Sequence, residues 1–410
     1  MARSHPAPHE VFTPGSPPLN PQNVYVNRTS AEQALRRYVQ RHQVPVVWGE
    51  YGVGKTTLVQ RFFRAEHERA ELVYIASVAN LEIDDIFRTI LEHLDYRVEV
   101  QKVRSTDGGV GVGIDLKIVK ADVKMNGSET STSQLIVTSP TDTRMNQIIT
   151  AADLTVVLDE MHKASPALRE SLVDWIKATR AEPEGLTLVL VGTSTDAGRL
   201  VALDTGIDRY VKEMSVDLMT LEEGRYIVDE GFARLGLQIT PELRERVVGA
   251  AAGAPTIIQS LCLDAAESVI QDGRDEVEAG DLQAAVDLYL KEHGGRLAEY
   301  YWRAIETTGP KRYRKQVLMA MAMIPSDCAT MDDIRRGVSE SLGEEVPSTT
   351  LSGPLRELKT EQYGKVLRDV DRPISGQRIH NLTAFSDPMM KSFVRFMNNL
   401  GQNGLEAPKG

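Results

Sequence analysis

A glycine-rich loop that ends in lysine and threonine stands between two apolar segments near the start of the chain. Residues 49–57 read GEYGVGKTT and have the spacing Gly-x4-Gly-Lys-Thr. The apolar run Val44–Trp48 precedes the loop and predicts a buried strand, and Leu58–Phe63 follows it and predicts a helix. Because a phosphate-binding loop requires a strand before it and a helix after it, the chain is predicted to fold around a parallel α/β sheet.

The residue types in this loop fit the chemistry of a bound nucleotide. Backbone N–H groups, the helix N-terminus and the ammonium of Lys55 all attract phosphate, and the Thr56 hydroxyl can ligate Mg²⁺. A glycine-rich turn with a solvated lysine is the alternative, and the strand and helix on either side favour the phosphate site. Glu50 and Tyr51 stand at variable positions and are expected to contribute only their backbone. The predicted contacts to ATP are Gly49, Glu50, Tyr51, Gly52, Val53, Gly54, Lys55, Thr56 and Thr57.

Two carboxylates follow a second apolar run. Leu154–Leu158 predicts a strand, and Asp159 and Glu160 come directly after it. Beside a phosphate loop, an aspartate can hold Mg²⁺ through water and a glutamate can polarise the water that attacks the γ-phosphate. A polar exit from a core strand is the alternative. We predict Asp159 as a metal-supporting residue and Glu160 as the catalytic base.

A third strand, Leu186–Val191, leads into the polar sequence Gly192–Thr195. In a parallel sheet with helices on both faces, ligands bind at the carboxyl ends of the strands. Thr193 is therefore predicted to contact the γ-phosphate or the attacking water, with Ser194 and Thr195 as neighbouring candidates. An ordinary turn is the alternative.

Composition restricts the class of protein. The chain has 410 residues, of which 41% are hydrophobic, and a net charge of −11. Its two cysteines, Cys262 and Cys328, are too few for a disulfide framework or a metal cluster. No apolar run reaches the length of a membrane span, and the N-terminus lacks the apolar stretch of a secretory signal. We therefore expect a cytoplasmic protein of two or three domains.

The segments outside these motifs have distinct patterns. Residues 1–23 are rich in Pro, Ser and Asn and are expected to lack fixed structure of their own, although they could strap across the domain. Residues 24–217 are predicted to form the ATPase core. Within it, residues 96–139 show period-two alternation and an Asn126-Gly127 turn, which predict a β-hairpin insertion; a floppy surface insertion is the alternative.

The second half of the chain is predicted to be mainly helical. Residues 218–292 carry helix starts at Thr220 and Thr240 and read as a helical lid, and Gly253-Ala254-Pro255 ends one helix and begins the next. Residues 309–400 show three helices, the third with Ser348 as a candidate cap, and then β-rich stretches at 363–368 and 377–382. That order is typical of a winged helix. Residues 401–410 form a tail.

The charge of residues 309–400 separates them from the rest of the chain. They hold 14 Lys+Arg against 11 Asp+Glu, a net +3, which leaves −14 elsewhere. The contrast favours this unit for a nucleic-acid contact, through phosphate neutralisation and a helix in the major groove. A protein-binding module with scattered surface charges would look similar. The candidate DNA contacts are Thr349, Ser352, Arg356 and Lys359 on the third helix and Arg378 on the hairpin.

Together these motifs resemble an AAA+ ATPase of the initiator and STAND-like branch, which includes origin-recognition proteins, transposition regulators and related signalling ATPases. The resemblance covers residues 24–400. It implies that Lys55 and Thr56 bind phosphate and Mg²⁺ and that Asp159 and Glu160 serve hydrolysis. It also implies an arginine late in the core that reaches a neighbouring subunit's nucleotide.

Arg209 lies near the expected place of that arginine, and Arg199 is the alternative; either could equally be a surface arginine. The sequence Gly253-Ala254-Pro255 looks like the Gly-x-Pro signature of STAND switches, in which the proline sits against the nucleotide. The resemblance therefore adds Pro255 to the nucleotide contacts and leaves a lid arginine in doubt.

Three functional hypotheses follow from the sequence. The first is a homo-oligomeric, DNA-binding ATPase. The second is a STAND-type signalling or phage-defence ATPase that acts on a partner protein such as a nuclease or transposase. The third is a nucleotide-dependent scaffold with negligible turnover.

Overall fold

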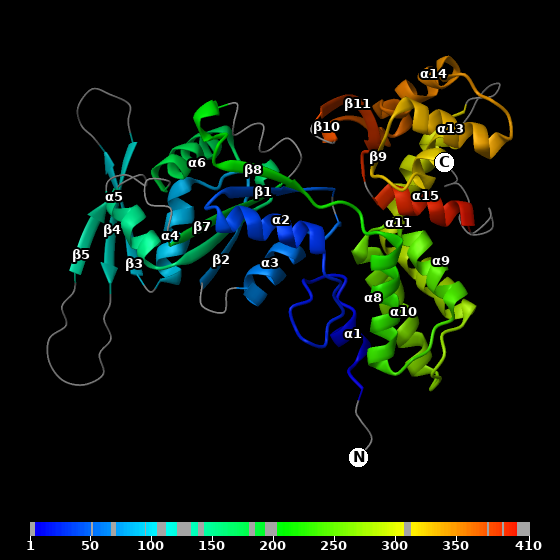
Figure 1. Cartoon of the computed structure of the whole chain (residues 1–410), viewed down its shortest axis with the longest axis horizontal. Coiled ribbons are helices and arrows are strands. Elements are labelled where there is room, and N and C mark those ends of the chain that lie inside the picture. Colours follow the sequence, from blue (N-terminus) through cyan, green and yellow to red (C-terminus); the bar gives the residue numbers. More distant parts are fainter. Residues whose placement is uncertain are drawn as a thin grey trace. The chain divides into compact units, whose positions relative to one another are not determined.

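A computed structural model describes residues 5–50, 52–66, 71–94, 96–104, 112–120, 133–137, 143–179, 185–192, 203–306, 313–374, 377–387 and 389–399. The chain divides into two compact units, which we describe one at a time (Figure 1). The sheet unit comprises residues 28–49 and 58–215. The helical unit comprises residues 1–27, 50–57 and 216–410, so that it includes most of the glycine-rich loop.

The sheet unit is built on five parallel strands in the order β2-β6-β7-β1-β8. The strands are β1 Val44–Trp48, β2 Glu71–Ala76, β6 Leu154–Asp159, β7 Leu186–Gly192 and β8 Val211–Ser215. The three core strands predicted from the sequence are confirmed. Because these strands are parallel and β7 lies between β1 and β6, the carboxyl ends of the three strands, at Trp48, Asp159 and Gly192, lie at the same edge of the sheet.

Both faces of this sheet are covered, which explains why its strands are apolar along their whole length. Val156 and Val157 are adjacent on β6, face opposite sides, and are both fully buried. The helices of the unit are α2 Thr29–Gln40, α3 Lys55–Glu66, α4 Ile83–His93, α5 Thr143–Ala151 and α6 Pro166–Thr179. Helices α4 and α6 share one core with alternate residues of the strands, and Phe87 packs edge-on against Trp175 there.

The insertion after α4 is a three-stranded antiparallel sheet (Figure 1). Its strands are β3 Tyr96–Arg104, β4 Val112–Lys120 and β5 Ser133–Val137. The predicted two-stranded hairpin therefore has one strand too few, since β3 pairs with β4 along its full length. The predicted turn at Asn126-Gly127 falls outside the described residues.

Four helices begin the large part of the helical unit: α8 Leu221–Leu235, α9 Pro241–Ala251, α10 Pro255–Gln271 and α11 Ala279–Ile305. Both predicted helix starts are confirmed. Thr220 Oγ1 accepts from the Glu223 amide over 3.1 Å, and the Glu223 carboxylate accepts from the Thr220 amide over 2.8 Å. Helix α11 continues to Ile305, well past the boundary at residue 292 that the sequence suggested. In the part of the chain that the structure describes, no helix could cross a membrane.

Residues 5–27 form an N-terminal strap across these helices. The strap contains the short helix α1 Pro8–Val11, and Phe12 is fully buried against Phe232, with ring centroids 5.5 Å apart. The guanidinium of Arg234 donates to the backbone carbonyls of three strap residues, the shortest contact being 2.7 Å to Asn23. The strap therefore has structure that its composition did not predict, because its order comes from the helices beneath it.

Residues 313–399, which we call the C-terminal domain, contain three helices followed by an antiparallel hairpin and a last helix. The elements are α12 Arg314–Met323, β9 Cys328–Ala329, α13 Met331–Leu342, α14 Ser348–Leu358, β10 Leu367–Ile374, β11 Gln377–Phe385 and α15 Met389–Asn399. Two details differ from the prediction. Pro347, not Ser348, precedes the first turn of α14, and no side chain caps that helix. The hairpin begins at Leu367, because residues 361–363 form a 3-10 turn.

This domain and the preceding helices belong to the same compact unit. One hydrophobic core runs through both, and Phe393 of α15 packs edge-on against Tyr301 of α11 at 5.7 Å. The rings of Tyr289 and Phe396 also lie close together, tilted to each other, with their centroids 5.9 Å apart. The apolar face of α15 is therefore buried by α11, and the two regions form one body.

Candidate functional site

The glycine-rich loop has the backbone shape of an anion-binding turn. Gly52 and Gly54 have φ values of 77° and 92°, which residues with a Cβ rarely adopt. Val53 between them is buried and anchors the loop, and Lys55 begins α3. The Lys55 ammonium donates to the backbone carbonyl of Glu50 over 2.8 Å, so the lysine is folded over its own loop.

The first turn of α10 lies directly against this loop. A Cβ placed on Gly54 would be 3.8 Å from Cγ of Pro255, and one placed on Gly52 would be 4.0 Å from Oγ1 of Thr256. The amino end of a helix of this length carries partial positive charge. The helix therefore brings both Pro255, expected from the sequence, and an electropositive terminus to the glycines of the loop.

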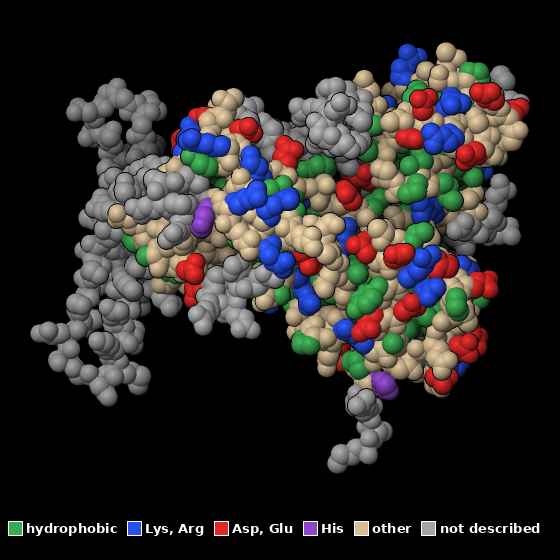
Figure 2. Space-filling model, viewed as in Figure 1, with side chains coloured by type: hydrophobic (Ala, Val, Ile, Leu, Met, Phe, Trp, Pro, Cys, Tyr) green, Lys and Arg blue, Asp and Glu red, His purple; other side chains and the backbone are tan. Residues whose placement is uncertain are grey.

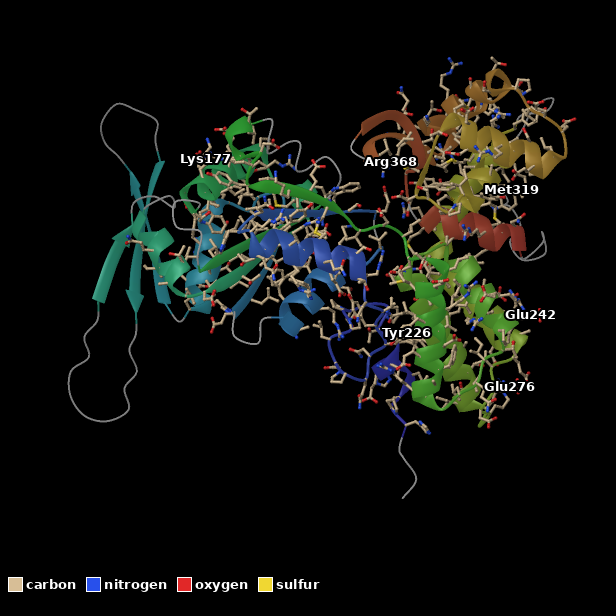
Figure 3. All side chains as sticks on the ribbon, viewed as in Figure 1. Lys177, Tyr226, Glu242, Glu276, Met319 and Arg368 are labelled. Carbon is tan, nitrogen blue, oxygen red and sulfur yellow. The ribbon has the colours of Figure 1, made fainter. Side chains whose placement is uncertain are left out.

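Glu50 takes part through its side chain, which the sequence did not predict. Its carboxylate accepts from Nη2 of Arg368 on β10, at 2.8 Å to Oε1 and 3.0 Å to Oε2. Figure 3 labels Arg368 on the hairpin. No local signal could have revealed this contact, because the partners are 318 residues apart. Tyr51 falls outside the described residues.

In the sheet unit, Asp159 ends β6 and is only 3% exposed. One of its oxygens accepts from the hydroxyl of Tyr74 on the neighbouring strand, and the other accepts from the Glu160 amide over 2.6 Å. Both contacts orient the carboxylate. Tyr74 was not among the predicted site residues, although its register beside β6 places it on the same face of the sheet as Asp159.

Glu160 has a backbone conformation that side-chain-bearing residues avoid. Its φ and ψ of 59° and 34° lie in the left-handed region, where backbone strain of about 1 to 2 kcal/mol is usual. Such strain often marks functional positions. The Glu160 carboxylate lies 2.9 Å from the Lys163 ammonium and 3.4 Å from Nε2 of His162. It is one-third exposed, so water can reach it.

The remaining predicted core residues have different outcomes. Thr193, Ser194, Thr195 and Arg199 fall outside the described residues, so their assignments stay predictions. Arg209 is exposed, and its guanidinium stacks 4.6 Å from the ring of the adjacent Tyr210. An exposed arginine fits both the role in a neighbour's site and the role of a surface residue.

The candidate DNA contacts lie on α14 and the hairpin. Thr349, Ser352 and Arg356 are exposed, as the sequence predicted. Lys359 is not free, because it pairs with Asp369 of β10. Arg378 lies on β11, and its side chain is outside the described residues. In Figure 2, basic and acidic side chains are interspersed over the visible face of the C-terminal domain.

Each of the two motifs carries an oxygen donor of a kind that binds Mg²⁺. Thr56 stands in the first turn of α3, and Asp159 ends β6. Both offer the oxygen ligands that this ion prefers, and Mg²⁺ usually keeps several waters and nucleotide oxygens as its other ligands. Among the described residues, no cluster of His, Cys, Asp and Glu gathers to hold a metal by itself.

Comparison with known proteins agrees with this geometry. Residues 36–200 match the model of an AAA domain. A Walker-type ATPase of Pyrococcus abyssi has a similar structure, with a TM-score of 0.51 and 14% identity over 93% of this chain and 99% of that one. The Orc1 protein of Aeropyrum pernix, solved with DNA, gives 0.46 and 15% identity over 96% and 98% of the two chains.

The Cdc6p protein of Pyrobaculum aerophilum gives a TM-score of 0.45 and 14% identity over 93% of this chain and 96% of that one. No curated protein matches the chain. The parallel sheet, the glycine-rich loop and the matched AAA domain define a P-loop ATPase with the AAA+ fold. The helices and the C-terminal domain that follow residue 216 extend beyond the matched region.

Proposed function

We propose that this chain is an ATP-binding and ATP-hydrolysing switch of the initiator type. In this proposal it forms homo-oligomers in the cytoplasm and couples its nucleotide state to DNA engagement through a C-terminal winged helix. One observation carries the proposal. The amino end of α10, with Pro255 and Thr256, lies against Gly54 and Gly52 of the phosphate loop. A nucleotide in the loop would therefore contact the amino end of α10. A change from ATP to ADP would alter that contact.

The residues of the chain divide the chemistry between them. Lys55 and the amides of the loop neutralise phosphate charge, and Glu160 orients the attacking water. Bound Mg²⁺, held by Thr56 and supported by Asp159, would supply further neutralisation of phosphate charge. The Lys163 ammonium lies 2.9 Å from one oxygen of the Glu160 carboxylate. The attacking water must therefore bind the carboxylate beside Lys163 or replace it. Thr193 remains the proposed contact to the γ-phosphate.

Oligomerisation is proposed on the position of Arg209. An exposed arginine at the end of the sheet can reach a nucleotide bound by a neighbouring copy, and such arginines accelerate hydrolysis. The rate per chain would then rise with protein concentration. A surface arginine with no such role would leave the rate per chain constant.

The DNA part of the proposal rests on the order of elements in the C-terminal domain. Helices α12, α13 and α14 precede the β10–β11 hairpin, and α14 exposes Thr349, Ser352 and Arg356. An exposed helix with an arginine can enter the major groove. The hairpin would then lie beside the phosphate backbone.

A second candidate function is a STAND-type signalling ATPase, for example in phage defence, that acts on a protein. The charge pairing in the C-terminal domain favours it, because pairing reduces the positive potential available to DNA. The ion pairs of this domain include Arg336 with Asp333, Lys359 with Asp369, and Lys365 with Glu361. Its effector partner would be a nuclease or a transposase.

Nucleotide binding and phosphate release together test the proposal. Lys55→Ala should abolish ATP binding in calorimetry, whereas Glu160→Gln should bind ATP and release little phosphate. Lys291→Ala, a change at an exposed lysine of α11, is the matched control and should behave as the wild type. Equal turnover by the wild type and Glu160→Gln would show that the catalytic assignment is wrong. Binding without turnover in the wild type would favour the scaffold hypothesis.

A further inference from the structure

Glu50 holds two contacts at once, one through its side chain and one through its backbone. The carboxylate pairs with Arg368 of the hairpin, and the carbonyl oxygen accepts from the Lys55 ammonium over 2.8 Å. Only 10% of the Glu50 side chain is exposed, against 38% of the Arg368 side chain. Lys55 of the loop and Arg368 of the hairpin therefore both bind Glu50.

A carboxylate in this place works against anion binding unless it is neutralised. Two like charges a few ångströms apart repel each other, and the repulsion grows where water is excluded. The Arg368 guanidinium contacts both Glu50 oxygens and cancels that charge. Removing Arg368 would take this guanidinium contact away from a nearly buried carboxylate in the phosphate loop, so the negative charge there would oppose phosphate binding more strongly.

The hairpin is close to the loop over more than this one pair. Glu50 and Gly52 line a cavity together with Phe385, at the end of β11, and Met389, at the start of α15. Thr256 of α10 lines the same cavity. Residues of the loop, of α10 and of the end of β11 therefore surround one cavity, in addition to the Glu50–Arg368 pair.

We propose that Arg368 is a positioning residue for the phosphate loop, which couples docking of the β10–β11 hairpin to nucleotide binding by neutralising Glu50. The inference rests on the proposed ATP binding and adds its regulation. Docked, the hairpin leaves Lys55 as the dominant charge that an entering phosphate meets. Because coupling is reciprocal, bound nucleotide holds the hairpin docked by the same factor. A partner that binds Arg368 in place of Glu50, as a DNA phosphate would, lowers the affinity for nucleotide.

A double-mutant cycle on the full chain tests the coupling, with MgATP binding measured by calorimetry. Arg368→Ala should weaken binding about 5- to 150-fold, the usual range of such coupling. Arg368→Lys should keep part of the affinity, since it retains the positive charge but not the planar guanidinium whose Nη2 contacts both Glu50 oxygens. Glu50→Gln should bind at least as tightly as the wild type, and adding Glu50→Gln to Arg368→Ala should restore binding. Arg336→Ala, a change to an exposed arginine of α13, is the control.

The pattern of results separates this inference from the proposed function. If the wild type binds MgATP and Arg368→Ala binds equally well, the coupling is wrong and the proposed function stands. If Arg368→Ala weakens binding but Glu50→Gln does not rescue it, Arg368 acts in some other way and the coupling through Glu50 is wrong. If the wild type does not bind MgATP at all, both fall. Hydrogen exchange in β10 gives the reciprocal readout, and MgATP should slow it in the wild type but not in Arg368→Ala.

Discussion

The hydroxyl of Ser392 on α15 donates to the backbone carbonyl of Ala251, the last residue of α9, over 2.9 Å. Both residues are buried. The Arg395 guanidinium adds a second contact of this kind, 2.7 Å from the carbonyl of Gly249. The last carbonyls of a helix have no partner within it, so α15 satisfies the end of α9. The C-terminal domain thus supplies hydrogen-bond donors to the end of a preceding helix.

Replacing Phe393 should test this dependence. The side chain is 2% exposed and packs against Tyr301, so Phe393→Ala is expected to lower the free energy of unfolding of the helical unit by about 3 to 5 kcal/mol. Urea denaturation followed by hydrogen exchange of α9 and α11 measures the effect. Asn398→Ala, at an exposed position of the same helix, should change stability little. Loss of structure in residues 313–399 alone would contradict a shared core.

Gly253 should be intolerant of a side chain because of its place before α10. Its φ is 82°, and a Cβ would lie 2.8 Å from the carbonyl oxygen of Met219. The amide of Met219 also donates a hydrogen bond to the Gly253 carbonyl over 2.8 Å, so the two backbones are held close together. Gly253→Ala is therefore expected to cost about 1 to 3 kcal/mol of stability and to displace Pro255 from the loop.

Gly253→Ala is also expected to weaken ATP binding. Calorimetry should show lower affinity even for the fraction of the variant that is folded. Gly249→Ala is the matched control, since Gly249 lies within α9 and a Cβ there meets nothing within 4 Å. Alanine within a helix should leave stability unchanged or raise it by up to about 1 kcal/mol. Unchanged ATP binding in folded Gly253→Ala would remove the support that α10 gives to the proposed function.

The parts of the site that could be predicted are those with local signals. The strand, glycine loop and helix around Lys55 are contiguous in sequence, and Asp159 follows an apolar run whose length and composition indicate a strand. Patterns of this kind depend on backbone geometry and burial, which neighbouring residues largely determine.

The parts that could not be predicted depend on contacts between distant segments. Glu50 occupies a variable position of its motif, and nothing near it indicates Arg368 as a partner. Lys359, the residue that follows α14, has the spacing of an outward-facing residue, yet Asp369 of the hairpin pairs with it. The hairpin prediction did not include strand β3, because its pairing with β4 is a contact between two segments and leaves no pattern within either one.

The pH dependence of stability should reveal Lys391. Burial, with a smaller contribution from nearby Arg395, lowers the pKa of Lys391 to about 7, and its ammonium donates to the carbonyl of Ser326 over 2.7 Å. An unfolded lysine has a pKa of about 10.4. Below pH 7 the folded protein bears the full cost of a buried charge. As pH rises from about 7 towards 10, the unfolded state binds more protons than the folded state, so stability rises.

Relative to Lys391→Met, the wild type is expected to gain about 2 kcal/mol of unfolding free energy between about pH 7 and about pH 9. Urea denaturation at the two pH values measures the gain. Lys291→Met, at an exposed lysine, should show no such difference from the wild type. An equal pH dependence in the wild type and Lys391→Met would show that Lys391 titrates normally.

Arg356 distinguishes the two candidate targets of the C-terminal domain. It is exposed on α14 and has no ion-pair partner among the described residues, whereas Lys359 pairs with Asp369. If α14 contacts DNA, Arg356→Ala should weaken binding to a labelled duplex of mixed sequence and lower the slope of log affinity against log salt by about 1. Lys359→Ala should have a smaller effect, because its charge is already partly neutralised.

Arg336→Ala, on α13, controls for the loss of a positive charge elsewhere in the domain. Fluorescence anisotropy over a range of salt concentrations with MgATP present measures all four proteins. Absence of binding by the wild type at low salt would exclude the DNA-binding role and leave a protein as the partner.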